Sequence, residues 1–314
     1  MLVYLDSAAS RRGEPNENFA REVMELFTLG EGEYAEADIK EAARAFTGWS
    51  VNPDSGEFLW RPFAHDDGVK TVLGRSGTLR GDDVLDILLA QPATAEFIAA
   101  KLWREFVSPA PSNEAERRDA ARIAQRFRDS GYDIKSVLRE LFLSDAFWAP
   151  ENRATLVKSP VELVVGTLRQ LDIEVSDPLP FTLLLRRLGQ DLFSPPNVKG
   201  WPGGEAWINS TRLLARKQFL ERLTRVDDGP SEMRVLETPP AGMGKLAMQA
   251  RARAFRAMND IRFHSRDWLH QFEGKEFAAQ LVLLPGLPAR QGAGESYGLD
   301  LVRVLVSDPM YQLK

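Results

Sequence analysis

Apolar residues in this chain recur at the spacing of about 3.6 positions that is typical of amphipathic helices, and almost no segment alternates apolar and polar residues. Residues 16–49 show this most clearly, as two amphipathic stretches joined by a glycine-rich turn. Phe19, Val23 and Phe27 share one face of the first stretch, and Gly30 stands where a helix ends in a left-handed residue. The pattern predicts an all-α, irregular multi-helix fold with at most a small β-hairpin near residues 57–74.

Further helices follow from the same periodicity. They are expected at residues 81–108 with a break near Pro92, and at residues 113–130, 133–147, 158–171, 181–192 and 206–225. After the turn residues 52–56, residues 58–63 and 70–73 are the two segments expected to form the hairpin or an extended loop.

The length and apolar content of the chain permit one large domain. It has 314 residues, of which 44% are hydrophobic, and this is ample for a packed core. We expect a single helical domain over residues 1–314. Residues 227–242, which are rich in Pro, Gly and acidic side chains, are the best candidate for an internal linker.

Charge and cysteine usage remove several classes of function. The net charge is −5, which gives no reason to expect a nucleic-acid partner. The arginines at 251–266 are interpreted as a solvated helix face. The absence of cysteine excludes disulfides, thiolate catalysis and thiolate metal sites. No transmembrane segment is expected, because no apolar run reaches the ~18 residues needed to cross a bilayer.

The first helix carries many polar residues, and two interpretations of them stay open. Either they form a solvated face with local ion pairs, such as Glu17 with Arg21, or they form a polar network or ligand site. The candidates are Asn16, Asn18 and Arg21 for binding and Glu22 and Glu25 for catalysis.

The loop at residues 65–70 is the best candidate for catalytic chemistry. His65 stands beside Asp66, with Lys70 close behind, and a histidine next to carboxylates can act as a general base, a proton shuttle or a metal ligand. The other interpretation is a structural histidine that hydrogen-bonds to the loop backbone. His264 and His270 are six residues apart and point to different helix faces.

A second candidate lies around residues 199–212. Trp201 and Trp207, with Asn209 and Arg212 beyond them, have the composition of a carbohydrate-binding or aromatic-binding surface. The alternative is that the tryptophan rings anchor an irregular loop to the core. The sequence contains no HExxH, Walker, GxGxxG or GxSxG pattern, so no cofactor or metal is assigned and enzymatic activity stays open.

Residues 16–49, the His65 to Lys70 stretch and residues 199–212 together resemble the bacterial "domain of unknown function 1800" family. The resemblance implies no particular reaction. Members generally begin with a secretion signal and a further helical portion, so it implies that this chain is the C-terminal part of a longer periplasmic or extracellular protein. A natural short form is the alternative. Residues 1–314 carry no such signal, and a protein with only this sequence is expected to remain cytoplasmic.

Two expectations about local structure come from the same resemblance. Members usually carry Thr where this chain has Ala35, so the second helix is expected to lack an N-cap side chain and about 1 kcal/mol of stability. If an N-terminal region is missing, an exposed apolar patch is expected at Leu2, Tyr4, Phe19 and Phe27.

Two functions are compatible with these observations. The leading hypothesis is an exported helical scaffold or binding module that acts with a partner protein or a surface polysaccharide. Genes of similar proteins often stand beside genes of a sulfatase-like family, and this association favours work on surface polymers. The alternative is a hydrolase-like or metal-assisted enzyme that uses His65, Asp66 and the carboxylates Glu22 and Glu25.

Overall fold

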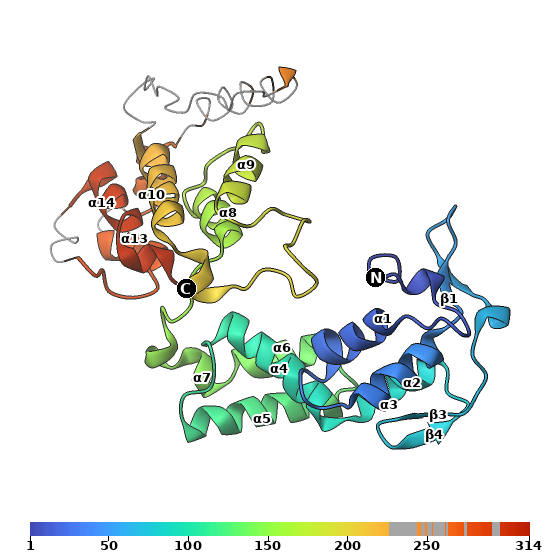
Figure 1. Cartoon of the computed structure of the whole chain (residues 1–314). Coiled ribbons are helices and arrows are strands. Elements are labelled where there is room, and N and C mark those ends of the chain that lie inside the picture. Colours follow the sequence, from blue (N-terminus) through green and yellow to red (C-terminus); the bar gives the residue numbers. More distant parts are fainter. Residues whose placement is uncertain are drawn as a thin grey trace. The chain divides into compact units, whose positions relative to one another are not determined.

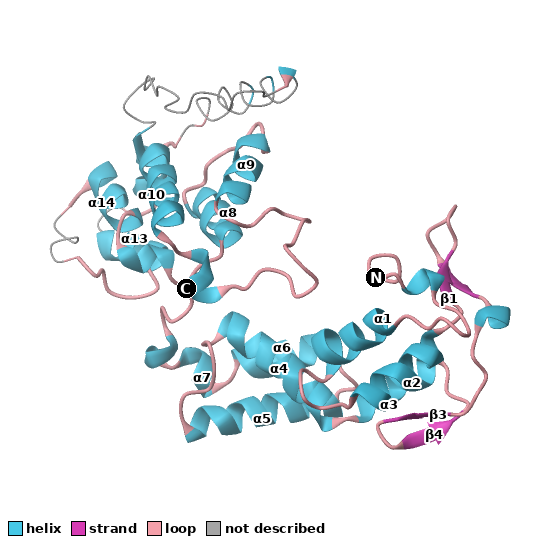
Figure 2. Cartoon of the chain, viewed as in Figure 1, coloured by secondary structure: helices cyan, strands magenta, loops and turns pink. Residues whose placement is uncertain are grey.

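The computed structural model describes residues 1–225, 244–245, 249, 253, 261, 263–272, 275–290 and 296–314. These residues group into two compact units, Met1–Ala149 and Pro150–Lys314. Helices dominate both units, which confirms the predicted all-α fold (Figure 2). The single domain stays a prediction, and the candidate linker at residues 227–242 lies outside the described residues.

The first unit combines helices with two small hairpins (Figure 1). Its α-helices are α1 (Glu17–Glu22), α2 (Glu36–Phe46), α3 (Gly81–Ala90), α4 (Pro92–Phe106), α5 (Glu114–Asp129), α6 (Ile134–Phe142) and α7 (Asp145–Trp148). Its strands are β1 (Trp49–Val51), β2 (Phe58–Trp60), β3 (Lys70–Val72) and β4 (Arg75–Gly77). The predicted break near Pro92 is confirmed, because this proline opens α4, where a helix tolerates a missing N–H.

Helix α1 continues directly into the π-helix η2 (Val23–Thr28). The hydroxyl of Thr28 donates to the backbone oxygen of Val23 at 2.7 Å, five residues earlier, and the N–H of Leu29 donates to Met24 at 2.8 Å. Gly30 ends this helix with φ of 88°, as expected for a left-handed terminal residue. The sequence predicted one regular helix here, and the wider turn of its second half was not foreseen.

Each strand of the first unit pairs with its nearest neighbour in sequence. Strand β1 pairs antiparallel with β2, with Trp49 opposite Trp60, and β3 pairs antiparallel with β4. The expected pairing of residues 58–63 with residues 70–73 is therefore wrong. The physical reason is that tight local turns close each hairpin, as at Gly56, whose N–H donates to the backbone oxygen of Asn52 at 2.9 Å.

Aromatic side chains fill the core where α1 meets α2. Phe46 packs edge to face on Phe19 and Trp49, with ring centroids 5.0 and 5.1 Å away. Phe19 is 4% exposed, so the expectation that it lies on an uncovered patch is wrong. Tyr4 and Phe27 are exposed, as expected. A second apolar cluster, centred on the buried Trp103, joins α4 to α5, α6 and α7.

The second unit is built from helices. They are α8 (Pro160–Gln170), α9 (Leu179–Arg187), α10 (Ser210–Arg225), α12 (Ser265–His270), α13 (Glu276–Leu283) and α14 (Gly298–Val306), with short 3-10 turns that include Gly204–Trp207. One apolar cluster runs through them. The chain end joins this unit, because Leu313 forms a β-bridge with Val157. Within the described residues, no helix has the length and apolar character required to cross a membrane.

Candidate functional site

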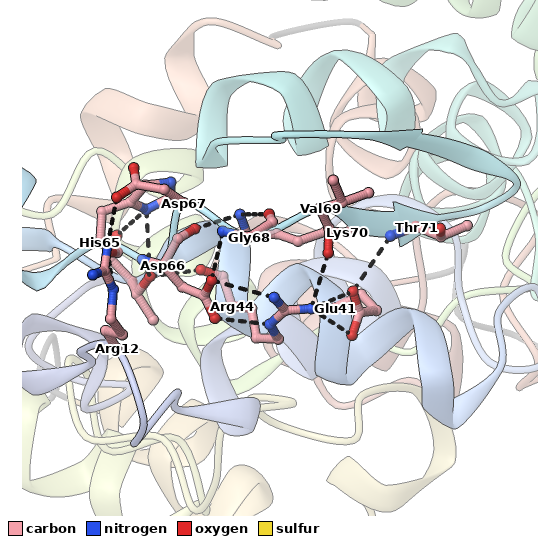
Figure 3. A network of polar contacts seen from close by, with 11 residues as sticks. Arg12, Glu41, Arg44, His65, Asp66, Asp67, Gly68, Val69, Lys70 and Thr71 are labelled. Carbon is pink, nitrogen blue, oxygen red and sulfur yellow. Dashed lines mark hydrogen bonds and ion pairs between the residues drawn. The ribbon is translucent and has the colours of Figure 1, made fainter.

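His65 lies buried in the loop that joins the two hairpins (Figure 3). Its Nδ1 is 2.9 Å from the backbone oxygen of Thr47, and its ring packs on Trp60 with centroids 5.0 Å apart. A carbonyl oxygen only accepts hydrogen bonds, so Nδ1 is the protonated nitrogen. The side chain is 2% exposed. This geometry agrees with the structural interpretation of His65, and a catalytic role stays a prediction.

Asp66 is held by Arg44 from the last turn of α2. Arg44 donates from Nε to Oδ2 at 2.8 Å and from Nη2 to Oδ1 at 3.2 Å, while its Nη1 donates to both carboxylate oxygens of Glu41 (Figure 3). The hydrogen bonds from Arg44 lower the pKa of Asp66 to about 2. Asp66 is therefore ionised at neutral pH, and its pKa lies far from the value that suits a general base.

Lys70 and Arg12 close the same loop on its backbone side. Lys70 is 1% exposed, and its Nζ donates to the backbone oxygens of Asp66 and Gly68. Burial lowers its pKa. Arg12 donates to the backbone oxygen of His65 at 2.9 Å and pairs with Asp67. The charged side chains of residues 65–70 thus form hydrogen bonds and ion pairs that stabilise the conformation of the loop.

Three predicted binding residues lie at the N-cap of α1 or within it, and one of them also contacts α2. Asn16 is the N-cap, because its Oδ1 accepts from the backbone N–H of Asn18 at 2.8 Å, and the side chain of Asn18 itself is exposed. Arg21 donates two hydrogen bonds of 2.7 Å to Glu36 and lies 4.0 Å from Glu17. These contacts agree with local capping and ion pairing.

The carboxylates Glu22 and Glu25 lie on the half-buried side of the same helix. Glu22 ends α1. Glu25 lies in η2 and accepts from the hydroxyl of Tyr34 at 3.1 Å, and burial together with this bond raises the pKa of Tyr34 to about 12. Among the described residues, no three His, Asp or Glu side chains form a group suited to hold a metal ion.

The structure brings three predicted binding residues of the second unit to one cavity. Trp201, Trp207 and Arg212 line a cavity of about 240 Å3, together with Arg186 and Asp191. Trp207 is 6% exposed, so its ring also anchors the loop to the core. Trp201 is half-buried and is the more accessible indole.

Asn209, the fourth predicted binding residue of this region, has a capping role. Its Oδ1 accepts from the backbone N–H of Arg212 at 2.8 Å, immediately before the first residue of α10. This bond satisfies one of the free N–H groups at the helix start. Arg212 in turn donates from Nη1 to the backbone oxygen of Ala206 at 2.6 Å, which ties α10 to the preceding 3-10 turn.

A family described as "Protein of unknown function (DUF1800)" matches residues 1–313, essentially the whole chain. The chain belongs to the DUF1800 family. No curated protein and no solved structure matches it.

In this DUF1800 chain, sequence reasoning missed Arg44, Arg12 and the buried Arg216 of α10. No local spacing links Arg44 to Asp66, which is 22 residues away. The sequence did contain a pattern that could have identified Arg216, because this arginine lies one helical turn after Arg212. Two like charges at that spacing repel each other unless a further group compensates them.

Proposed function

We propose that this DUF1800 chain is a binding module that holds a surface polysaccharide in the cavity at the start of α10. The observation that supports this proposal is the meeting of Trp201, Trp207 and Arg212 at one cavity of about 240 Å3. Flat indole rings offer apolar faces for a sugar ring, and a guanidinium offers several donors for its oxygens. A cavity with apolar walls and a few polar groups is typical of ligand sites.

Replacement of Trp201 tests the proposal. The full chain should bind at least one soluble polysaccharide in a panel of neutral and acidic ones, measured by affinity electrophoresis and isothermal titration. Trp201→Ala should cost about 2 kcal/mol, roughly a thirtyfold loss of affinity, as truncation of an aromatic anchor does. The matched control is Trp148→Ala, which removes a more exposed tryptophan of the first unit. Equal losses in both variants would contradict the proposal.

The alternative proposal is a hydrolase-like or metal-assisted enzyme that uses His65, Asp66, Glu22 and Glu25. It has less support, since a general base must come within hydrogen-bond reach of its substrate and His65 is 2% exposed. Metal analysis of the full-length protein separates the two proposals. Stoichiometric metal that is lost in His65→Ala would favour the enzyme.

We also propose that the protein acts outside the cytoplasm, as the resemblance to exported members implies. A surface polysaccharide is reached only there. Cell fractionation of the natural host, with an antibody against this chain, tests the location. A purely cytoplasmic signal would contradict it.

A further inference from the structure

Arg212 reaches the cavity with most of its hydrogen-bonding capacity unused. A guanidinium has five N–H donors. Within the described residues the side chain makes one hydrogen bond, from Nη1 to Ala206, and no ion pair. Its plane is held against Gly189, where an added Cβ would lie 2.6 Å from Nη2 and 2.7 Å from Cζ. The guanidinium therefore occupies the space beside the cavity that a side chain at position 189 would fill.

The other charges at the cavity leave it positive. Among the described lining residues Asp191 is the one acid, and it pairs with Arg186 at 2.9 Å. No carboxylate in the described part of the chain then forms an ion pair with Arg212. It also lies in the first turn of α10, which contains no acidic residue, although the positive end of a helix dipole favours anions.

A second arginine, without an ion pair among the described residues, lies one turn further along α10. Arg216 is 0% exposed and donates to the backbone oxygen of Lys158 at 2.8 Å and to Gln312 at 3.2 Å. No described carboxylate forms an ion pair with it. Burial, and then repulsion by Arg212, lower the pKa of Arg216 to about 10, against a smaller opposing attraction to Glu162. Buried charges are normally paired, so this end of the helix carries excess positive charge.

We propose, building on the polysaccharide binding proposed above, that the cavity selects an acidic sugar residue. The carboxylate or sulfate of that sugar pairs with Arg212, and its ring lies against Trp201. An oxyanion in the cavity offsets the positive charge of Arg212 and Arg216. It also interacts favourably with the positive N-terminal end of α10. Arg212 presents a planar fork of donors, which suits both oxyanions. The whole chain has a net charge of −5, which repels an acidic ligand at long range. The attraction of the ligand to Arg212 therefore acts only within the cavity.

The test compares oligosaccharides that differ in charge. The full chain is titrated with oligogalacturonate and with its methyl ester, and with dextran sulfate and dextran. At least one acidic form should bind tenfold or more tightly than its neutral partner. Raising NaCl from 50 to 500 mM should weaken binding of the acidic ligand to the wild-type chain and leave binding of the neutral ligand unchanged. This salt dependence should be lost in Arg212→Gln. Preference for uronate or for sulfate identifies which oxyanion the site takes.

Two variants connect the selectivity to the arginine. Arg212→Gln should abolish the difference between acidic and neutral ligands, and Arg212→Lys should keep part of it. Arg117→Gln, an exposed arginine of the first unit, is the control and should change neither. Equal binding of charged and neutral sugars would overturn the acidic selectivity while the polysaccharide proposal stands. Absence of binding to every sugar would overturn both.

Discussion

Arg44 and Asp66 are joined by two hydrogen bonds, from Nε to Oδ2 at 2.8 Å and from Nη2 to Oδ1 at 3.2 Å. The pair connects the last turn of α2 to the loop between the hairpins. Both side chains are mostly covered, at 28% and 20% exposure. Their attraction is therefore screened less than that of a surface pair.

Asp66→Asn should lower the free energy of unfolding by about 2 kcal/mol at pH 7. The folded-state pKa of Asp66 is about 2, below the usual value, so its contribution is full above pH ~4 and is lost as the pH falls towards 2. Urea unfolding at pH 7 and pH 3 measures this. The wild type should lose more stability than the variant on acidification. Asp67→Asn, at an exposed pair, is the control, and an equal effect there would contradict the prediction.

Lys158→Met should stabilise the protein at pH 7 by about 1–2 kcal/mol, because a half-buried charge is replaced by an apolar chain of similar length. Burial lowers the pKa of Lys158 to about 8. A lowered lysine pKa destabilises the fold below pH 8, and this cost is relieved as the pH rises from 8 towards the unfolded value of ~10.4. The gain should therefore shrink by pH 10. Lys217→Met, on the surface of α10, should show neither effect in the same unfolding series.

Gly48→Ala should destabilise the first unit by more than Gly131→Ala. Both glycines have positive φ, 84° and 69°, so each substitution carries left-handed strain of about 1–2 kcal/mol. At Gly48 an added Cβ also lies 2.7 Å from the backbone oxygen of Arg61, whereas nothing lies within 4 Å at Gly131. Thermal melts of the two variants compare them. Equal shifts in Tm would mean that the backbone at Gly48 moves aside without cost.

Ala35→Thr should raise the free energy of unfolding by about 0.5–2 kcal/mol. Ala35 is the N-cap of α2 and lacks a side-chain acceptor, while its backbone N–H already donates to Asp38 at 2.9 Å. A threonine hydroxyl completes the reciprocal half of that capping box. Ala35→Val has the same branched shape without an acceptor, and it is the control. A gain of equal size from valine in urea unfolding would show that capping is not the cause.

The helices were predictable because their signals are local. Pro92 and Pro160 each open a helix at the position where a missing N–H costs nothing. The expectation that Ala35 is an N-cap residue without a capping side chain came instead from the family resemblance, and it is confirmed. The meeting of Trp201, Trp207 and Arg212 at one cavity was suggested by their proximity in the chain.

The rest depends on contacts between distant residues. Nothing near His65 in the sequence shows that the backbone oxygen of Thr47 will accept a hydrogen bond from Nδ1 of His65. Nor does it show that Arg44 will form an ion pair with Asp66. The π-helix η2 has the same apolar composition as an ordinary helix, so periodicity cannot reveal it. The prediction of strand pairing was wrong for a related reason. Strands of three residues contain too little alternation of apolar and polar side chains to define their partners.

The guanidinium of Arg44 organises its loop by ionic and backbone contacts, with Asp66, Glu41 and the backbone oxygen of Val69 as acceptors. Guanidinium chloride supplies the same ion in free form, as a competitor for those carboxylates. Urea has no charge with which to compete. The two denaturants should therefore unfold this protein along different routes, with the loop at residues 65–70 loosening early in guanidinium chloride and late in urea.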